Sequence, residues 1–130
     1  MSIPAEPERL NPEGFAAYAS RAGDGMPVVM LNLLRFRPEG GREHYEEYGA
    51  AVAPLLEKVG GRIHFVGQAG PPLLSGGPWD LVLLVEYPTR QAFLEMVGSE
   101  AYQAIAHLRT EALAEGELHP LDPGAAPPSP

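Results

Sequence analysis

The sequence predicts an α+β domain in which helices cover one face of a single antiparallel sheet. Val28–Phe36 and Leu81–Tyr87 are apolar runs about as long as one buried strand. Each run contains one strongly polar residue, Asn32 in the first and Glu86 in the second. Because polar groups are costly inside a sheet unless they are satisfied, these two positions indicate a lined cavity or a buried hydrogen-bond network.

The composition is that of a folded domain with an acidic surface. The chain has 130 residues, enough for one core, and 45% of them are hydrophobic. Seventeen acidic residues against nine basic ones give a formal net charge of −8. This charge repels phosphate backbones and anionic lipids, so we expect neither nucleic acid nor a membrane among the partners.

The absence of cysteine excludes disulfides, thiolate nucleophiles and cysteine-ligated metals. The first residues carry neither a basic leader nor an apolar segment typical of a signal peptide. The longest apolar runs are too short to span a bilayer. We therefore expect a soluble, cytoplasmic protein.

Residues 1–27 are predicted to form an N-terminal arm with one short helix. Pro4 and Pro7 break any earlier structure. Asn11 is a helix N-cap and Pro12 suits the first helical position. The helix should end near Gly23, where turn residues begin.

The central domain, residues 28–121, begins with the strand Val28–Phe36. Apolar residues at helical spacing predict a helix over Arg42–Val59, which Gly60-Gly61 should close. Pro54 lies inside this helix and is expected to kink it or to split it.

Two further strands follow. Arg62–Gly67 alternates apolar and polar residues, and Gln68–Trp79 is a connection rich in glycine and proline. Leu81–Tyr87 is the third strand.

Two helical segments and one strand complete the domain. Thr89 is expected to cap one helical segment and Ser99 a second. A weak last strand is predicted near Glu117–Leu121. Residues 122–130 read as a disordered proline-rich tail.

From Val28 the order is therefore strand, helix, strand, strand, helix, strand, which is the βαββαβ pattern of a ferredoxin-like fold. Alternation along the strands then sorts their residues between two faces. The residues expected to face the helices are Val29, Leu31, Leu33, Ile63, Phe65, Leu81, Leu83 and Val85. The opposite face carries Val28, Met30, Leu34, Val66, Val82 and Leu84. An apolar face of this size implies a partner, and we expect a second copy of the chain, packed sheet against sheet.

The same alternation places Asn32, His64 and Glu86 together on the face opposite the helices. There an imidazole and a carboxylate are candidate catalytic groups for general acid–base chemistry, and the amide is a candidate substrate ligand. The structural alternatives are that Asn32 bonds the backbone at a bulge, that Glu86 pairs with Arg62, and that His64 is a surface edge residue.

The order and spacing of several short motifs resemble those of the DUF1330 family over about Val28 to Arg109. These motifs are Met30-Leu31-Asn32-Leu33, Tyr45-x-x-Tyr48, Pro54-Leu55-Leu56 with Gly60-Gly61-Arg62, Trp79-Asp80, Glu86-Tyr87-Pro88 and Ser99-x-x-Tyr102-Gln103. The resemblance implies a dimeric α+β barrel, in which two ferredoxin-like sheets enclose a shared interior. It assigns no activity, because the wider superfamily includes cofactor-free monooxygenases, isomerases, haem enzymes and small binding or stress proteins.

Four more residues are candidates for substrate binding. Tyr45 and Tyr48 share one helical face and otherwise pack the core. Trp79 ends the long connection, where it either closes a lid or dimer contact or holds the loop in place. Arg109 either binds a carboxylate or complements the helix dipole.

We expect no metal and no cofactor. The helical pairs His44 with Glu47 and His107 with Glu111 each lack an obvious third ligand. The chain has no phosphate-binding glycine loop, no dinucleotide fingerprint, no nucleophile elbow and no H-E-x-x-H motif.

Three functions remain open from the sequence. The first is a homodimer that binds a small apolar or aromatic molecule in the barrel cavity and acts as a cofactor-free oxygenase or isomerase, with His64 or Glu86 as base. The second is a non-catalytic ligand-binding or stress-related dimer that uses the same cavity. The third is a structural module whose barrel interior is packed solid.

Overall fold

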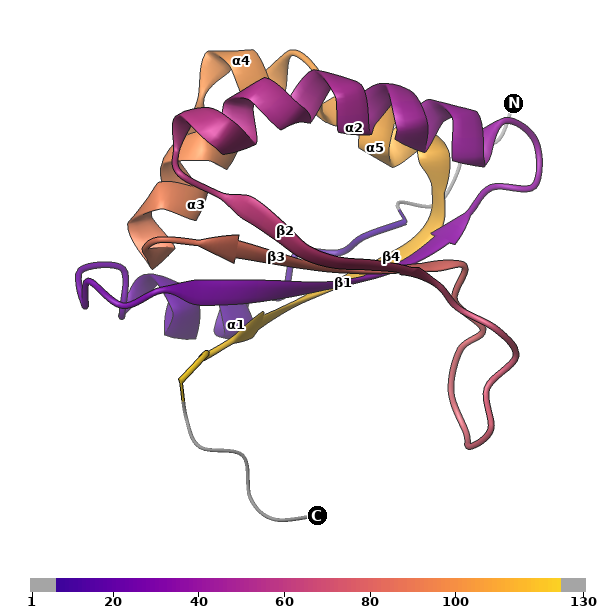
Figure 1. Ribbon diagram of the computed structural model, residues 1–130, viewed down its shortest axis with the longest axis horizontal. Helices are drawn as coiled ribbons and strands as arrows, with labels where there is room; N and C mark the ends of the chain where they lie inside the picture. Colours follow the sequence, from indigo (N-terminus) through magenta and orange to yellow (C-terminus); the bar gives the residue numbers. More distant parts are fainter. Residues whose placement is uncertain (1–6, 125–130) are drawn as a thin grey trace.

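A four-stranded antiparallel sheet carries most of the helices on one of its faces (Figure 1). The computed structural model describes residues 7–124. The elements in chain order are α1 (Pro12–Ala19), β1 (Val28–Phe36), α2 (Gly41–Lys58), β2 (Arg62–Gln68), β3 (Leu81–Tyr87), α3 (Arg90–Gly98), α4 (Glu100–Gln103), α5 (Ala106–Ala112) and β4 (Leu113–Leu121). Within the described range, none of the helices combines the length and the apolar character that a membrane crossing requires.

The predicted ferredoxin-like class is confirmed. From β1 the chain runs strand, helix, strand, strand, helical segments, strand. β1 lies at the centre and pairs with β3 on one side and β4 on the other, while β2 forms the edge next to β3. Most of the predicted tail, residues 125–130, lies outside the described residues.

Side-chain caps begin the helices where the sequence places them. The backbone N–H of Gly14 donates to Asn11 Oδ1 at 3.0 Å, and that of Ala92 donates to Thr89 Oγ1 at 3.0 Å. Gly60, with a φ of +81°, follows the end of α2 as expected. β4 begins at Leu113, earlier than predicted. Of the two effects expected of Pro54, the split does not occur, because α2 continues through this residue as one helix.

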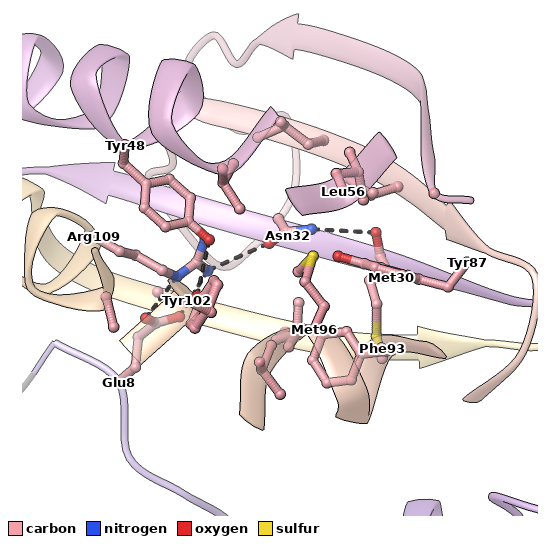
Figure 2. Close-up of a pocket in the computed structure, with 18 of the residues that line it drawn as sticks. Glu8, Met30, Asn32, Tyr48, Leu56, Tyr87, Phe93, Met96, Tyr102 and Arg109 are labelled. Carbon is pink, nitrogen blue, oxygen red and sulfur yellow. Dashed lines mark hydrogen bonds and ion pairs between the residues drawn. The ribbon is translucent and has the colours of Figure 1, made fainter. Parts of the chain in front are cut away.

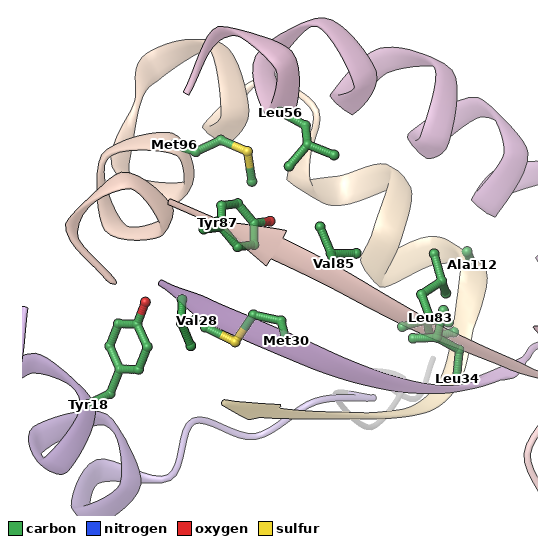
Figure 3. Packing of buried hydrophobic residues seen from close by; sticks show 11 residues of the cluster. Tyr18, Val28, Met30, Leu34, Leu56, Leu83, Val85, Tyr87, Met96 and Ala112 are labelled. Carbon is green, nitrogen blue, oxygen red and sulfur yellow. The ribbon is translucent and has the colours of Figure 1, made fainter. Parts of the chain in front are cut away.

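The core lies between the sheet and the helix layer (Figure 3). The sheet contributes residues from β1, β3 and the start of β4, and the helices contribute the rest. The buried members are Tyr18, Val28, Met30, Leu34, Leu56, Leu83, Val85, Tyr87, Met96, Ala112 and Leu113.

The two faces of β1 are the reverse of the predicted ones. Met30 lies opposite Val85 of β3 and Asn32 lies opposite Leu83, and these two β3 residues are buried under the helices as predicted. The even-numbered residues of β1 therefore face the helices. Because β1 is apolar on both sides, hydrophobic alternation does not show which of its faces the helices cover. The polar residue of this strand, Asn32, lies on the covered face and is buried.

A bulge changes the phase of β2. Ile63 pairs with Val85, whereas Phe65 pairs with Leu84, so Ile63 and Phe65 lie on opposite faces of the sheet. Ile63 faces the helices as predicted, but Phe65 and the residue after it take the faces opposite to the predicted ones. An inserted residue leaves no mark in the hydrophobic pattern of a short strand.

Removing a core side chain should cost far more stability than removing an exposed one. Leu34 is fully buried and Leu73 is 99% exposed. We expect Leu34→Ala to lower the free energy of unfolding by about 2–5 kcal/mol, because it loses apolar burial and leaves a cavity. The matched control Leu73→Ala should change it by less than about 0.5 kcal/mol. Urea denaturation followed by circular dichroism measures both, and equal losses would contradict this core.

Candidate functional site

A cavity of about 1070 Å³ lies between the helix-facing side of the sheet and the helices (Figure 2). Its volume is at the upper end of the range for small-molecule sites. Most of its wall is apolar. The side chains that form the apolar part include Met30, Leu56, Leu83, Val85, Phe93 and Met96.

One end of the cavity is polar and is organised by Arg109 of α5. The Nε and Nη2 atoms of Arg109 donate to the two carboxylate oxygens of Glu8, each at 2.9 Å. Nη2 also donates to Asn32 Oδ1 at 3.3 Å. The side chain of Arg109 is 12% exposed, so this cation depends on the two acceptors for the hydrogen bonds that it loses from water.

Tyrosines complete the polar end. The guanidinium carbon of Arg109 lies 5.7 Å from the ring centroid of Tyr48, a cation–π contact. The hydroxyls of Tyr48 and Tyr102 are 2.9 Å apart and share one hydrogen bond. The ring of Tyr45 packs against that of Tyr48 with a centroid separation of 5.5 Å.

Asn32 is polar because both ends of its amide are needed. Its Oδ1 accepts from Arg109, and its Nδ2 donates to the backbone carbonyl of Met30 at 3.3 Å. The residue is 6% exposed and lies on the central strand, directly below the helices. A buried amide that is satisfied in this way positions the guanidinium and carries little penalty.

Burial determines the protonation of these groups. It raises the pKa of Tyr45 to about 12, and burial together with the neighbouring Tyr48 raises the pKa of Tyr102 further. Burial alone would lower the pKa of Arg109, but the hydrogen bonds and charge of Glu8 outweigh it, and the net shift is upward. At neutral pH the cavity therefore offers protonated phenols and a charged guanidinium.

The structure brings together four of the predicted site residues. Asn32, Tyr45, Tyr48 and Arg109 all line the cavity. Trp79 does not line it; this residue lies beside Arg35, with 6.0 Å between the guanidinium carbon and the ring centroid.

His64 and Glu86 lie on the other side of the sheet from Asn32, so the predicted group of three is not brought together. Glu86 lies opposite Val29, one residue out of phase with the cavity-facing positions. Glu86 Oε2 accepts from Arg62 Nε at 3.1 Å, which is the ion pair weighed as a structural alternative. His64 Nε2 lies 3.5 Å from the other carboxylate oxygen.

His44 contacts a different carboxylate from Glu47, the one that its sequence spacing suggests. His44 Nε2 lies 3.9 Å from Glu111 Oε2 across two helices, and its Nδ1 is 2.8 Å from the carbonyl of Gly40. Among residues 7–124, no three potential histidine or carboxylate ligands gather into a metal-binding group.

Sequence reasoning missed two residues of the polar end. Tyr102 carries a signal, because it belongs to one of the short motifs of the resemblance. Glu8 carries none, because it lies in a proline-broken arm outside the recognisable core and reaches Arg109 across 101 positions of sequence.

The buried phenols predict a delayed alkaline titration. Burial raises the pKa values of Tyr18 and Tyr45 to about 12 and moves those of Tyr87 and Tyr102 upward as well. Because the fold favours the protonated phenol, this contribution to stability is complete below about pH 10 and is lost as the pH rises through the folded-state values. We expect the ultraviolet absorbance of phenolate to appear together with unfolding. In guanidinium chloride all five tyrosines should ionise near pH 10, at about their ordinary value; the same curve for native protein would refute the burial.

Three solved structures place this fold among known proteins. A protein of unknown function from Rhodopseudomonas palustris is 31% identical, with a TM-score of 0.82 over 91% of this chain and 97% of that one. A dimeric protein of unknown function and ferredoxin-like fold from Bacteroides fragilis is 16% identical, with a TM-score of 0.54 over 74% and 95% of the two chains. The hydroxynitrile lyase from Passiflora edulis is 11% identical, with a TM-score of 0.61 over 80% and 99%. The last two likenesses concern the fold alone.

The family comparison agrees with the resemblance in the sequence. A search of curated proteins found no match. Residues 40–118, which include Tyr45, Tyr48, Tyr102 and Arg109 of the cavity, match the family described as a domain of unknown function, DUF1330. The chain belongs to the DUF1330 family.

Proposed function

We propose that the protein binds a small, largely apolar molecule in the cavity between the sheet and the helices, with the polar group of the ligand at the Arg109 end. The observation that carries this proposal is the combination of a preformed apolar cavity with convergent polar groups at one end. Cavities of this kind are the usual form of small-molecule sites.

The wall chemistry favours an aromatic or otherwise flat apolar body. The rings of Tyr87 and Phe93 meet edge to face, with centroids 5.2 Å apart, and leave ring surface toward the cavity. Met30 and Met96 add flexible thioethers, which adapt to irregular shapes and contact aromatic rings favourably. At the opposite end, protonated phenols and the guanidinium donate hydrogen bonds to a ligand oxygen.

Binding is better supported than acid–base catalysis. Glu8, the carboxylate at the polar end, is engaged by Arg109, and the raised pKa values of Tyr45 and Tyr102 disfavour phenolate. His64 and Glu86 do not line the cavity. Their role as catalytic bases stays a prediction, and it requires a site on the open sheet face.

A neutral fluorescent probe tests the cavity. We expect N-phenyl-1-naphthylamine to bind with a strong rise in fluorescence. Ala106 lines the cavity next to the polar end, whereas Ala104, two positions earlier, is exposed and does not. Ala106→Trp should weaken binding by about tenfold, because the indole occupies ligand space. The matched variant Ala104→Trp should bind as the wild type does. No fluorescence rise with the wild type would refute the proposed function.

We also propose that two copies pack through the open sheet face. That face carries half-buried or exposed apolar side chains, namely Leu31, Leu33, Phe65, Val82, Leu84 and Leu121. The β2–β3 loop, with Leu73 and Leu74 almost fully exposed, projects on the side of the sheet away from α2 (Figure 1). The Bacteroides fragilis protein of the same fold is dimeric. Sheet-to-sheet packing would remove this apolar surface from water.

A charge on the open face should separate the two copies. Leu84 lies on β3 in the middle of that face, paired with Leu31. Leu84→Glu would bury an unpaired carboxylate from each copy, which costs several kcal/mol. We expect light scattering to give twice the chain mass of 13.9 kDa for the wild type and a single chain mass for the variant. Ala50→Glu, on the exposed surface of α2, should remain dimeric. A monomeric wild type would refute the proposed dimer.

A further inference from the structure

We propose that Glu8 stands in for the carboxylate of the ligand, and that the natural ligand is a carboxylic acid with an apolar body that displaces the N-terminal segment from Arg109. This inference rests on the proposed binding function and names the chemical class of the ligand. The segment formed by residues 7–11 and α1 is called the N-terminal wall below.

The contact between Glu8 and Arg109 has the geometry of a bound carboxylate ligand. Both oxygens of Glu8 accept from adjacent nitrogens of one guanidinium, each at 2.9 Å, which is the bidentate arrangement that arginine offers to free carboxylates. The acceptor enters from outside the βαββαβ unit, at the polar end of the cavity (Figure 2). Everything else that holds Arg109, including Asn32 and Tyr48, belongs to that unit.

Arg109 requires an anionic partner whenever Glu8 is absent. Its side chain is 12% exposed, and without Glu8 its remaining described partners, the Asn32 amide and the side chains of Tyr48 and Tyr45, carry no negative charge. An uncompensated cation in this position is costly, so the empty site would bind a carboxylate of suitable shape. The adjacent apolar cavity accommodates the body that such a carboxylate would carry.

The part of the N-terminal wall that precedes α1 is lightly attached, whereas α1 is anchored by the Tyr18 hydroxyl, which donates to the carbonyl of Arg90 at 2.9 Å. Leu10 and Phe15 line the cavity but are 73% and 46% exposed, and Tyr18 is the buried residue of α1. The backbone N–H of Gly116 donates to the carbonyl of Pro7 at 3.0 Å and joins this wall to β4. Segments with few buried apolar contacts open at low free-energy cost, so a ligand can move residues 7–11 while Tyr18 keeps α1 attached to the core.

Gly116 provides the space that the Glu8 side chain occupies. A Cβ atom at position 116 would lie 2.8 Å from Glu8 Oε2 and 2.9 Å from its Cδ and Cγ atoms. A side chain at 116 therefore requires the Glu8 side chain to shift from its present position. Gly116→Ala consequently tests the displacement of Glu8 without changing the charge of the chain.

The competing explanation is that Glu8 is a fixed structural partner of Arg109. A fixed partner would make removal of the Glu8 charge costly and would not yield to a ligand carboxylate, so the wild type would bind a carboxylate no more tightly than its neutral isostere. A stand-in predicts selectivity for the carboxylate form of a ligand over its neutral isostere. The two explanations thus differ in a binding ratio rather than in stability.

The experiment compares 2-naphthylacetate with its neutral isostere 2-naphthylacetamide by isothermal titration calorimetry. We expect the acetate to bind each of the variants Glu8→Gln and Gly116→Ala about 10- to 100-fold more tightly than it binds the wild type. This factor corresponds to the free energy of one charge-assisted bidentate contact. The acetamide should change by less than about threefold. Glu13→Gln removes a neighbouring exposed charge that does not line the cavity, and it should leave both affinities unchanged.

A second readout uses the wild type. Trypsin cleaves after Arg9, and the resulting fragment that begins at Leu10 is identified by its mass. Saturating 2-naphthylacetate should accelerate this cleavage several-fold, and the acetamide should not.

Three results would each overturn the stand-in role of Glu8. They are equal affinity changes for the two compounds in both variants, no binding of either compound, and no acceleration of cleavage by bound acetate. If N-phenyl-1-naphthylamine still binds in that case, the proposed cavity function survives alone. If that probe fails as well, the proposed function is wrong and the carboxylate inference falls with it.

Discussion

The burial of Arg109 is the constraint on which the rest of the cavity depends. A guanidinium that has left water must be given acceptors, and here Glu8 and Asn32 supply them. The need for an acceptor on the central strand accounts for a polar residue in the middle of β1. The need for an anion accounts for the position of the N-terminal segment. The tyrosines around the guanidinium are kept protonated by the same dry surroundings.

The sheet separates two surfaces with different chemistry. Its helix-facing side carries core residues such as Met30, Leu83 and Val85, which also form the wall of the cavity. The opposite side carries apolar residues together with the ion pair of Arg62 and Glu86 and the nearby His64. A ligand in the cavity and a second chain on the open face would therefore occupy opposite sides of β1 and β3. Neither event would obstruct the other, which allows one small domain to serve both purposes.

Much of the fold could be predicted because its signals are local. Asn11, Thr89 and Ser99 cap helices through bonds to backbone N–H groups three residues away, and such bonds depend on neighbouring residues alone. The order of strands and helices follows from periodicity in the same way. The candidate site was predictable in part: Asn32 interrupts an apolar strand, Tyr45 and Tyr48 share one face of a helix, and Arg109 lies near the end of another. The grouping of Asn32 with His64 and Glu86 was wrong, since β1 is apolar on both faces and β2 contains a bulge.

The sequence by itself determined the elements, their order, the ferredoxin-like class and the acidic, cysteine-free character of the chain, because each of these depends on composition or on residues close together in the chain. The tertiary structure alone decided which face of β1 is covered, on which side of the sheet the cavity lies, and that Glu8 meets Arg109. These outcomes depend on strand register and on contacts between segments a hundred positions apart. When both faces of a strand are apolar, hydrophobic alternation does not tell which face is covered. The residues around a carboxylate in a terminal arm do not identify its ion-pair partner, which is set only when the chain folds.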